Sequence, residues 1–257
     1  MRASSMLATG SNDSGIPCEV FIGCSLENTM AKTFTLTSDA FLRDAQTFVK
    51  RAARVNNSSA RLIAADGFLQ VYVGVLFPRG LLDRTPTVLG LHVFPLEQPE
   101  EFDVVVPLES LAHRIGVALE QDKREVVIPA EVASLAWAAI TPPRDEWKRR
   151  FGVSSAALSE AAQSGIARVA EAVPANAGES IVQKVRAEVW GETLAHHKRI
   201  PAGAAFAADA LGLLEGRNLQ VHTRDNWVRL SSKTGYVLVK FPSGHDFGPD
   251  DDAEDEV

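Results

Sequence analysis

The alternation of apolar and polar residues near the C-terminal end predicts a helix followed by three strands. Apolar residues recur at helical spacing over 202–214, and Gly216 is placed to end this helix. Beyond it, apolar residues occupy every second position in three short runs, which is the periodicity of half-buried strands. The runs span 219–223, 227–231 and 237–241, and turn-forming residues separate them. A helix that leads into a three-stranded antiparallel ribbon is typical of an α+β fold.

A second run of clear pattern lies near the N-terminal end. We expect a strand over 33–37, followed by a helix that reaches Val55 and that Ser38 or Asp39 caps. Residues 60–65 and 68–77 then read as two strands, and Asp66-Gly67 has the chemistry of a hairpin turn. The predicted buried stripe of the helix consists of Phe41, Ala45, Phe48, Val49 and Ala52.

The middle of the chain is harder to interpret. Three times an apolar residue or run meets a proline and then a predicted helix, at Pro107, Pro129 and Pro201, which is either an old duplication or chance. The second of these helices is predicted over 130–140. Residues 182–190 alternate as a strand would, and 191–199 is expected to be a polar loop. A further strand at 87–94 and an alanine-rich helix at 154–173 complete the predicted elements.

Composition predicts a soluble globular protein, and the absence of cysteines beyond Cys24 favours a cytoplasmic setting. Its hydrophobic fraction is 46% and its charged fraction 23%, which is ordinary for such proteins. We expect no membrane association, because no apolar run approaches the roughly 18–20 residues that a membrane span needs. The two cysteines, Cys18 and Cys24, lack nearby partners for a metal site and do not form a disulfide scaffold. We therefore expect neither a metal nor a cofactor.

The distribution of charge suggests how the chain is organised. The net charge is −7, and residues 246–257 contain seven acids and no base, so the rest of the chain is neutral. Such a run repels itself, and we expect a disordered acidic tail. It is either a solvated segment or a mimic of nucleic-acid charge that occupies a basic surface of this chain or of a partner. Residues 1–29 are expected to be a flexible leader, and 30–245 a globular body of one unit or of two, at about 30–143 and 151–245.

The clearest electropositive feature of the body lies on the first predicted helix. Its four basic residues recur at positions i, i+7, i+8 and i+11, which share one face of a helix. Four such side chains could neutralise several backbone phosphates of a nucleic acid, or they could form a solvated face. These candidate nucleic-acid-binding residues are Arg43, Lys50, Arg51 and Arg54.

We find no recognisable catalytic motif in the sequence. The nucleophile elbow, the phosphate-binding loop, the dinucleotide fingerprint and the zinc-protease motif are all missing from it. A small-molecule enzyme remains an alternative, with a site around Glu192, His196 and His197. We favour a protein that is not an enzyme.

Two parts of the chain together resemble a subdomain of the bacterial DNA sliding clamp, the β-clamp. The first part comprises Phe34-Thr35-Leu36-Thr37, the helix that ends at Val55, and the hairpin around Asp66-Gly67. The second comprises Ile200-Pro201 with its helix and the three strands that end at Phe241. The resemblance implies clamp-like βαβββ units, with helices on the side that faces DNA and the sheet facing outward. The basic residues of the first helix would then lie where DNA is contacted, whereas the helix at 202–214 carries Asp209 and no base.

These observations predict an α+β protein in which an antiparallel sheet is backed by helices. The favoured function is a non-enzymatic intracellular binding or scaffold module that is associated with DNA through the basic helix face. The alternatives are a protein–protein interaction module that does not bind nucleic acid, and the enzyme named above.

Overall fold

A computed structural model describes residues 32–55, 59–80, 82–132, 135–195 and 197–244. The chain divides into Met1–Ala31 and a compact unit, Lys32–Val257, to which all the described elements belong. The predicted leader with Cys18 and Cys24, the residue His196 and the acidic tail at 246–257 lie outside the described residues.

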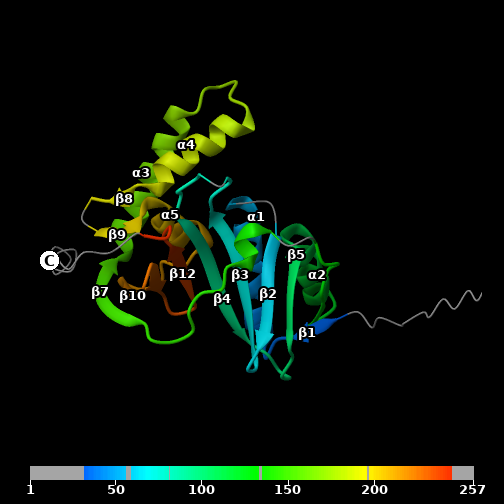
Figure 1. Ribbon diagram of the computed structural model, residues 1–257. Helices are drawn as coiled ribbons and strands as arrows, with labels where there is room; N and C mark the ends of the chain where they lie inside the picture. The colour runs from blue at the N-terminus through cyan, green and yellow to red at the C-terminus, as the bar shows by residue number, and fades with distance from the viewer. Residues whose placement is uncertain (1–31, 56–58, 81, 133–134, 196, 245–257) are drawn as a thin grey trace, which may run out of the picture. The chain divides into compact units, whose positions relative to one another are not determined.

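The unit is built on one antiparallel sheet of eight strands, in the order β5-β2-β3-β4-β12-β11-β10-β7 (Figure 1). Two strands far apart in the sequence meet at its centre, where β4 pairs with β12 and Val88 lies opposite Val239. The predicted α+β class with an antiparallel sheet is therefore confirmed. The strands are β2 (Ser59–Ala65), β3 (Phe68–Leu76), β4 (Thr87–Pro95), β5 (Phe102–Pro107), β7 (Lys148–Ser154), β10 (Asn218–Arg224), β11 (Trp227–Ser231) and β12 (Gly235–Lys240).

Helices cover one face of this sheet (Figure 1). Two of them, α1 (Asp39–Val55) and α5 (Ala202–Leu211), lie against the central strands and contact each other. Beside α1 lies α2 (Leu108–Glu120), and beside α5 lie α3 (Ser155–Ala172) and α4 (Glu179–Gly191). The main hydrophobic core fills the space between the helices and the sheet.

The opposite face of the sheet is covered by an irregular segment of chain. This segment contains the short 3-10 helix η1 (Ala136–Ala139), whose Trp137 is buried against Gly74 of β3. A Cβ atom added at Gly74 would come within 2.8 Å of the indole ring, so the close approach requires glycine. Two further ribbons complete the unit: β1 (Thr33–Thr35) with β6 (Glu125–Val127), and β8 (Thr193–Leu194) with β9 (His197–Pro201).

The elements predicted from local patterns near both ends are confirmed. The first helix ends at Val55 as expected, and the hydroxyl of Ser38 caps it by accepting a hydrogen bond from the Phe41 N–H at 3.3 Å. Asp66 and Gly67 have φ angles of 54° and 78°, which suit the tight turn of a hairpin. The three C-terminal strands form the ribbon β10-β11-β12.

Several predictions in the middle of the chain are wrong. Residues 182–190 lie in the helix α4 and not in a strand; Val189 and Trp190 at its C-terminal end are buried, beside α3 and α5. The predicted helix over 130–140 is reduced to η1 among the described residues, and the loop at 191–199 forms the ribbon β8-β9. The edge strand β7 (Lys148–Ser154) was not predicted from the sequence.

Two details of helix boundaries and faces also differ from expectation. The helix predicted over 202–214 ends at Leu211, because Gly212 adopts the left-handed conformation with φ 75° and caps it. Gly216 therefore lies beyond the end of this helix. On α1, Leu42 is buried in place of Phe41, which is 39% exposed.

Candidate functional site

The four basic residues predicted to contact nucleic acid all lie on α1, and all four are exposed. Because an α-helix turns by 100° per residue, Arg43, Lys50 and Arg54 fall within a sector of about 40°, and Arg51 lies beside it. From Arg43 to Arg54 the helix rises by about 16 Å. The structure thus places the four side chains on one continuous strip, which we call the α1 basic face.

The cations of the α1 basic face are not neutralised by nearby acids. Within the described residues, none of the four forms an ion pair, and Arg51 donates a hydrogen bond to the backbone oxygen of Leu211 at 3.4 Å. Asp44 on the same helix is directed to His92, with 3.3 Å between its Oδ2 and the Nε2 of the histidine. The charges of the α1 basic face are therefore available to an anionic ligand.

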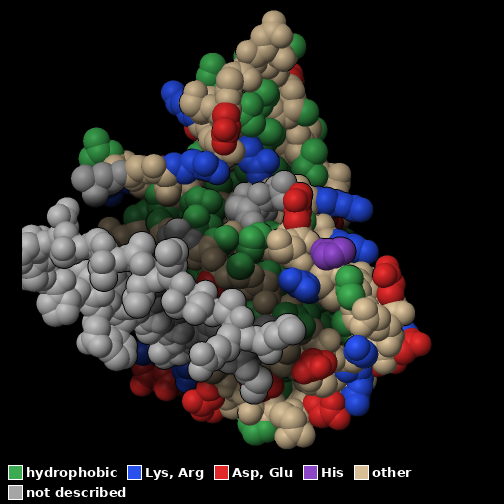
Figure 2. Space-filling view, turned by 90° about the vertical axis from the view of Figure 1, so that its right-hand side faces the viewer, with side chains coloured by type: hydrophobic (Ala, Val, Ile, Leu, Met, Phe, Trp, Pro, Cys, Tyr) green, Lys and Arg blue, Asp and Glu red, His purple; other side chains and the backbone are tan. Residues whose placement is uncertain are grey.

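The basic surface does not extend to the neighbouring helices. The charged residues of α2 are Glu109, Arg114 and Glu120, so its charges are of mixed sign. The charged residue of α5 is Asp209. Acidic and basic side chains are interspersed on the side of the unit near α2 and β5 (Figure 2). A nucleic acid would therefore meet one basic helix and not a broad positive surface.

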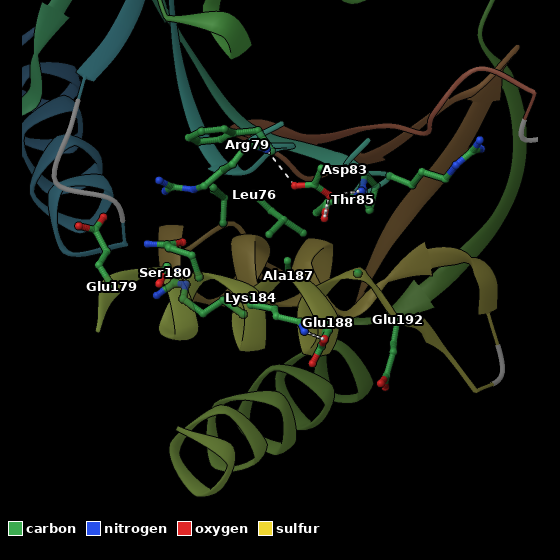
Figure 3. Close-up of a pocket in the computed structure, with 17 residues that line it drawn as sticks. Leu76, Arg79, Asp83, Thr85, Glu179, Ser180, Lys184, Ala187, Glu188 and Glu192 are labelled. Atoms are coloured by element: carbon green, nitrogen blue, oxygen red, sulfur yellow. Dashed lines mark hydrogen bonds and ion pairs between the residues drawn. The ribbon is translucent and has the colours of Figure 1, made fainter. Parts of the chain in front are cut away.

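A second feature, not predicted from the sequence, is a pocket of about 890 Å³ between α4 and the chain that connects β3 to β4. We call it the α4 pocket. Arg79, Asp83 and Thr85 of the connection face Lys184 and Ala187 of α4 across it (Figure 3). Its walls include the apolar residues Val75, Leu76, Phe77, Pro86, Ala187 and Gly191.

Charged groups line the α4 pocket, and several of them are already partnered. Burial, and then the charge of Arg79, lower the pKa of the Arg186 guanidinium. Burial raises the pKa of the Asp83 carboxyl. Hydrogen bonds from Thr85 and from the backbone N–H of Arg79 outweigh this effect, so the pKa is lowered overall. Glu192 forms an ion pair of 2.8 Å with Arg168, which lowers the pKa of that glutamate.

The residues of the alternative enzyme site are engaged separately. Glu192 is paired with Arg168, and the ring of His197 stacks on Phe151, with 5.2 Å between the ring centroids. His196 lies outside the described residues. In the described part of the chain, no three side chains of the metal-binding types come together as a candidate metal site. None of the described helices is long and apolar enough to cross a membrane.

Two family models match the chain, and each covers less than half of it. The family described as "Domain of unknown function (DUF8010)" matches residues 29–139, and "Domain of unknown function (DUF8185)" matches residues 142–244. The comparison with curated protein sequences finds no match.

Among solved structures, the chain is similar to bacterial sliding clamps. It is 12% identical to the Caulobacter crescentus pol III beta, with a TM-score of 0.45 over 85% of this chain and 67% of that one. For the Helicobacter pylori beta clamp bound to a DNA ligase peptide the identity is 10% and the TM-score 0.44, over 85% and 68% of the two chains. For the Thermotoga maritima DNA polymerase III beta subunit the identity is 12% and the TM-score 0.47, over 85% and 66%. The chain thus spans about two thirds of the length of these clamps, and its resemblance to them concerns the fold alone.

Proposed function

We propose that this chain is a non-enzymatic binding module that contacts the phosphate backbone of DNA through the α1 basic face. The observation that carries the proposal is the exposure of Arg43, Lys50, Arg51 and Arg54 on one helix, without ion pairs among the described residues. An arginine or lysine that has no acidic partner loses no existing ion pair when it approaches a phosphate. The free energy of binding then comes largely from counterions that the DNA releases.

The size of the α1 basic face limits what this binding can be. Four cations neutralise at most four phosphates, so the logarithm of the affinity should fall with the logarithm of salt concentration with a slope of about −3.6 or shallower. Contacts to phosphates carry no direct information on base sequence. We therefore expect weak binding without sequence preference.

The test is fluorescence anisotropy with a labelled DNA duplex over a range of salt concentrations. We expect the variant R43Q/K50Q/R51Q/R54Q to lose at least tenfold in affinity at low salt and to show a shallower salt slope. The matched control is R114Q/K123Q/R217Q/K233Q, which removes the same charge from four exposed cations elsewhere on the unit. Equal losses in the two variants, or binding that is indifferent to salt, would exclude the α1 basic face as the DNA contact.

A second candidate is a protein–protein interaction module that does not use nucleic acid. The observation that favours it is the pair α3 and α4, which projects from the rest of the unit (Figure 1) and exposes Ile166 at 41% and Ile181 at 49%. Retention of a protein partner by the wild-type chain, lost in I166S/I181S and unaffected by the α1 substitutions, would support this candidate.

A further inference from the structure

The C-terminal end of β12 lies next to one wall of the α4 pocket. Lys240, the last residue of β12, pairs with Thr87, the first residue of β4. The two residues before Thr87 are Thr85 and Pro86, and both line the pocket. The chain that follows β12 therefore starts beside the pocket, and a ligand that belonged to this chain would have a short path to it.

The pocket has an excess of unpaired positive charge once its existing partners are counted. Lys184 is within 3.9 Å of Glu188, Glu192 is paired with Arg168, and the oxygens of Asp83 accept bonds from N–H and O–H donors. Those donors are neutral, so Asp83 keeps its negative charge. Among the described residues that line the pocket, this leaves three cations, Arg79, Arg84 and Arg186, opposite two acids, Asp83 and Glu179. Glu179 lies at one end of the pocket (Figure 3).

Two of these cations, Arg79 and Arg186, lie close to an aromatic ring or are partly withdrawn from solvent. The guanidinium of Arg79 lies 5.3 Å from the centre of the Phe77 ring, and Arg186 is half-buried on α4. Two guanidinium groups that repel each other across an apolar floor are stabilised by an anion placed between them. The pocket therefore suits an extended ligand with carboxylates and a few apolar side chains.

We propose that the acidic segment 246–257 of this same chain docks in the α4 pocket, with its carboxylates at Arg79 and Arg186. The segment carries seven acids, no base, and a single aromatic residue, Phe247, which matches the apolar floor. The thirteen residues after Gly244 can span up to about 45 Å when extended, so the chain is long enough. Because the segment is tethered, its effective concentration is about millimolar, and a weak contact suffices for occupancy.

This inference concerns a different surface from the α1 basic face and does not depend on DNA binding. Its test uses a fluorescein-labelled peptide of residues 246–257 and the full chain in which all seven acids of the segment are replaced by their amides. We call this variant the neutral-tail chain. It should bind the peptide, and the substitutions R79Q/R186Q in it should weaken the binding at least tenfold. The charge-preserving pair R79K/R186K should retain most of the binding.

Two comparisons identify the occupant and the surface. The wild-type chain should bind the peptide at least tenfold more weakly than the neutral-tail chain, because its own segment competes. Substitution of the four cations of α1 in the neutral-tail chain should leave peptide binding unchanged.

The proposal is overturned if the neutral-tail chain does not bind the peptide saturably. It is also overturned if binding is lost with the α1 cations instead of Arg79 and Arg186, which would place the segment on the α1 basic face. Equal binding to the wild-type and neutral-tail chains would overturn it as well, since the pocket would then be open to the acidic segment of another protein.

Discussion

The two central helices, α1 and α5, lie on the same face of the same sheet and yet present different surfaces. On α5, seven of ten residues are buried, most of them alanine, and no base is present. On α1, five of seventeen residues are buried, and the opposite face carries the four cations. A helix that is apolar all round belongs inside a protein, whereas an amphipathic one lies at its surface.

The difference arises because α3 and α4 cover α5. Trp190 of α4 stacks on Phe206 of α5, with 4.5 Å between ring centroids, and it also packs over Gly165 of α3. Asp209, the acid of α5, accepts hydrogen bonds from Ser159 at 2.9 Å and from Gln163 at 3.2 Å, both on α3. Among the described residues, α5 is therefore covered by α3 and α4, whereas the cations of α1 stay exposed.

The two helices also differ in how they are held to the sheet. Leu211 of α5 lies over Gly90 of β4, where an added Cβ atom would come within 2.1 Å of a leucine methyl. At α1, the ring of His92 from β4 stacks on Phe94 at 4.2 Å and contacts Phe48 at 5.1 Å. The α5 contact is insensitive to pH because it is apolar, whereas the α1 contact contains a group that titrates.

The largest effect on the free energy of unfolding should come from placing a cation on each of the two helices in turn. Ala204 of α5 is fully buried, so Ala204→Arg would bury an unpaired charge and cost more than about 4 kcal/mol in the free energy of unfolding. Thr47→Arg adds the same residue to the exposed side of α1 and should change stability by less than about 0.5 kcal/mol. Urea unfolding followed by circular dichroism measures both. Similar stabilities for the two variants would mean that α5 is not covered as described.

A smaller loss should follow from Gly165→Ala, which acts on the cover of α5. A Cβ atom there would lie 2.1 Å from the Trp190 ring, so the ring must move, and we expect a loss of about 1–3 kcal/mol in the free energy of unfolding. Gly178→Ala is the matched control, because nothing lies within 4 Å of its added Cβ atom. An equal effect of the two substitutions in urea unfolding would contradict the packing of Trp190 on α3.

A pH-dependent loss of stability should distinguish the way α1 is attached to the sheet from the apolar attachment of α5. Burial lowers the pKa of His92 below its ordinary value of 6.5, against the attraction of Asp44 and Glu215. The unfolded chain then binds more protons than the folded one, so this contribution to stability is complete above about pH 6.5 and is lost as pH falls through the folded pKa.

In urea unfolding at pH 7.5 and 5.5, His92→Phe should reduce the loss of stability between the two values. It should not abolish that loss, because burial also lowers the pKa of His222. The same loss in both proteins would show that His92 does not contribute.

The smallest effect on stability should come from the α1 basic face itself. Lys50 is exposed and forms no ion pair among the described residues, so Lys50→Gln should change the free energy of unfolding by less than about 0.5 kcal/mol. Thermal unfolding of the single variant, measured beside the DNA-binding titration, separates a binding role from a structural one. A loss above about 1 kcal/mol would indicate that Lys50 supports the fold.

Local patterns determined the elements near both ends of the chain. The helix α1, its cap at Ser38, the Asp66-Gly67 turn and the ribbon β10-β11-β12 were all predicted, because short-range periodicity and turn chemistry decide such elements. The basic residues of α1 were found for the same reason, since helical spacing alone places them on one face. Whether they bind DNA stays a prediction.

Long-range packing decided the rest. Residues 182–190 alternate like a strand, yet they form α4, whose end at Val189 and Trp190 is buried beside α3 and α5, and no local pattern carries that information. The α4 pocket joins the connection after β3 to a helix about a hundred residues later, so it was invisible in the sequence. Burial of α5 likewise depends on α3 and α4.

The sequence by itself determined which segments form helices and ribbons near the two ends, because neighbours along the chain set those periodicities. Only the tertiary structure decided that α5 is covered while the basic face of α1 stays exposed, and where a pocket opens, because both depend on segments far apart in the chain.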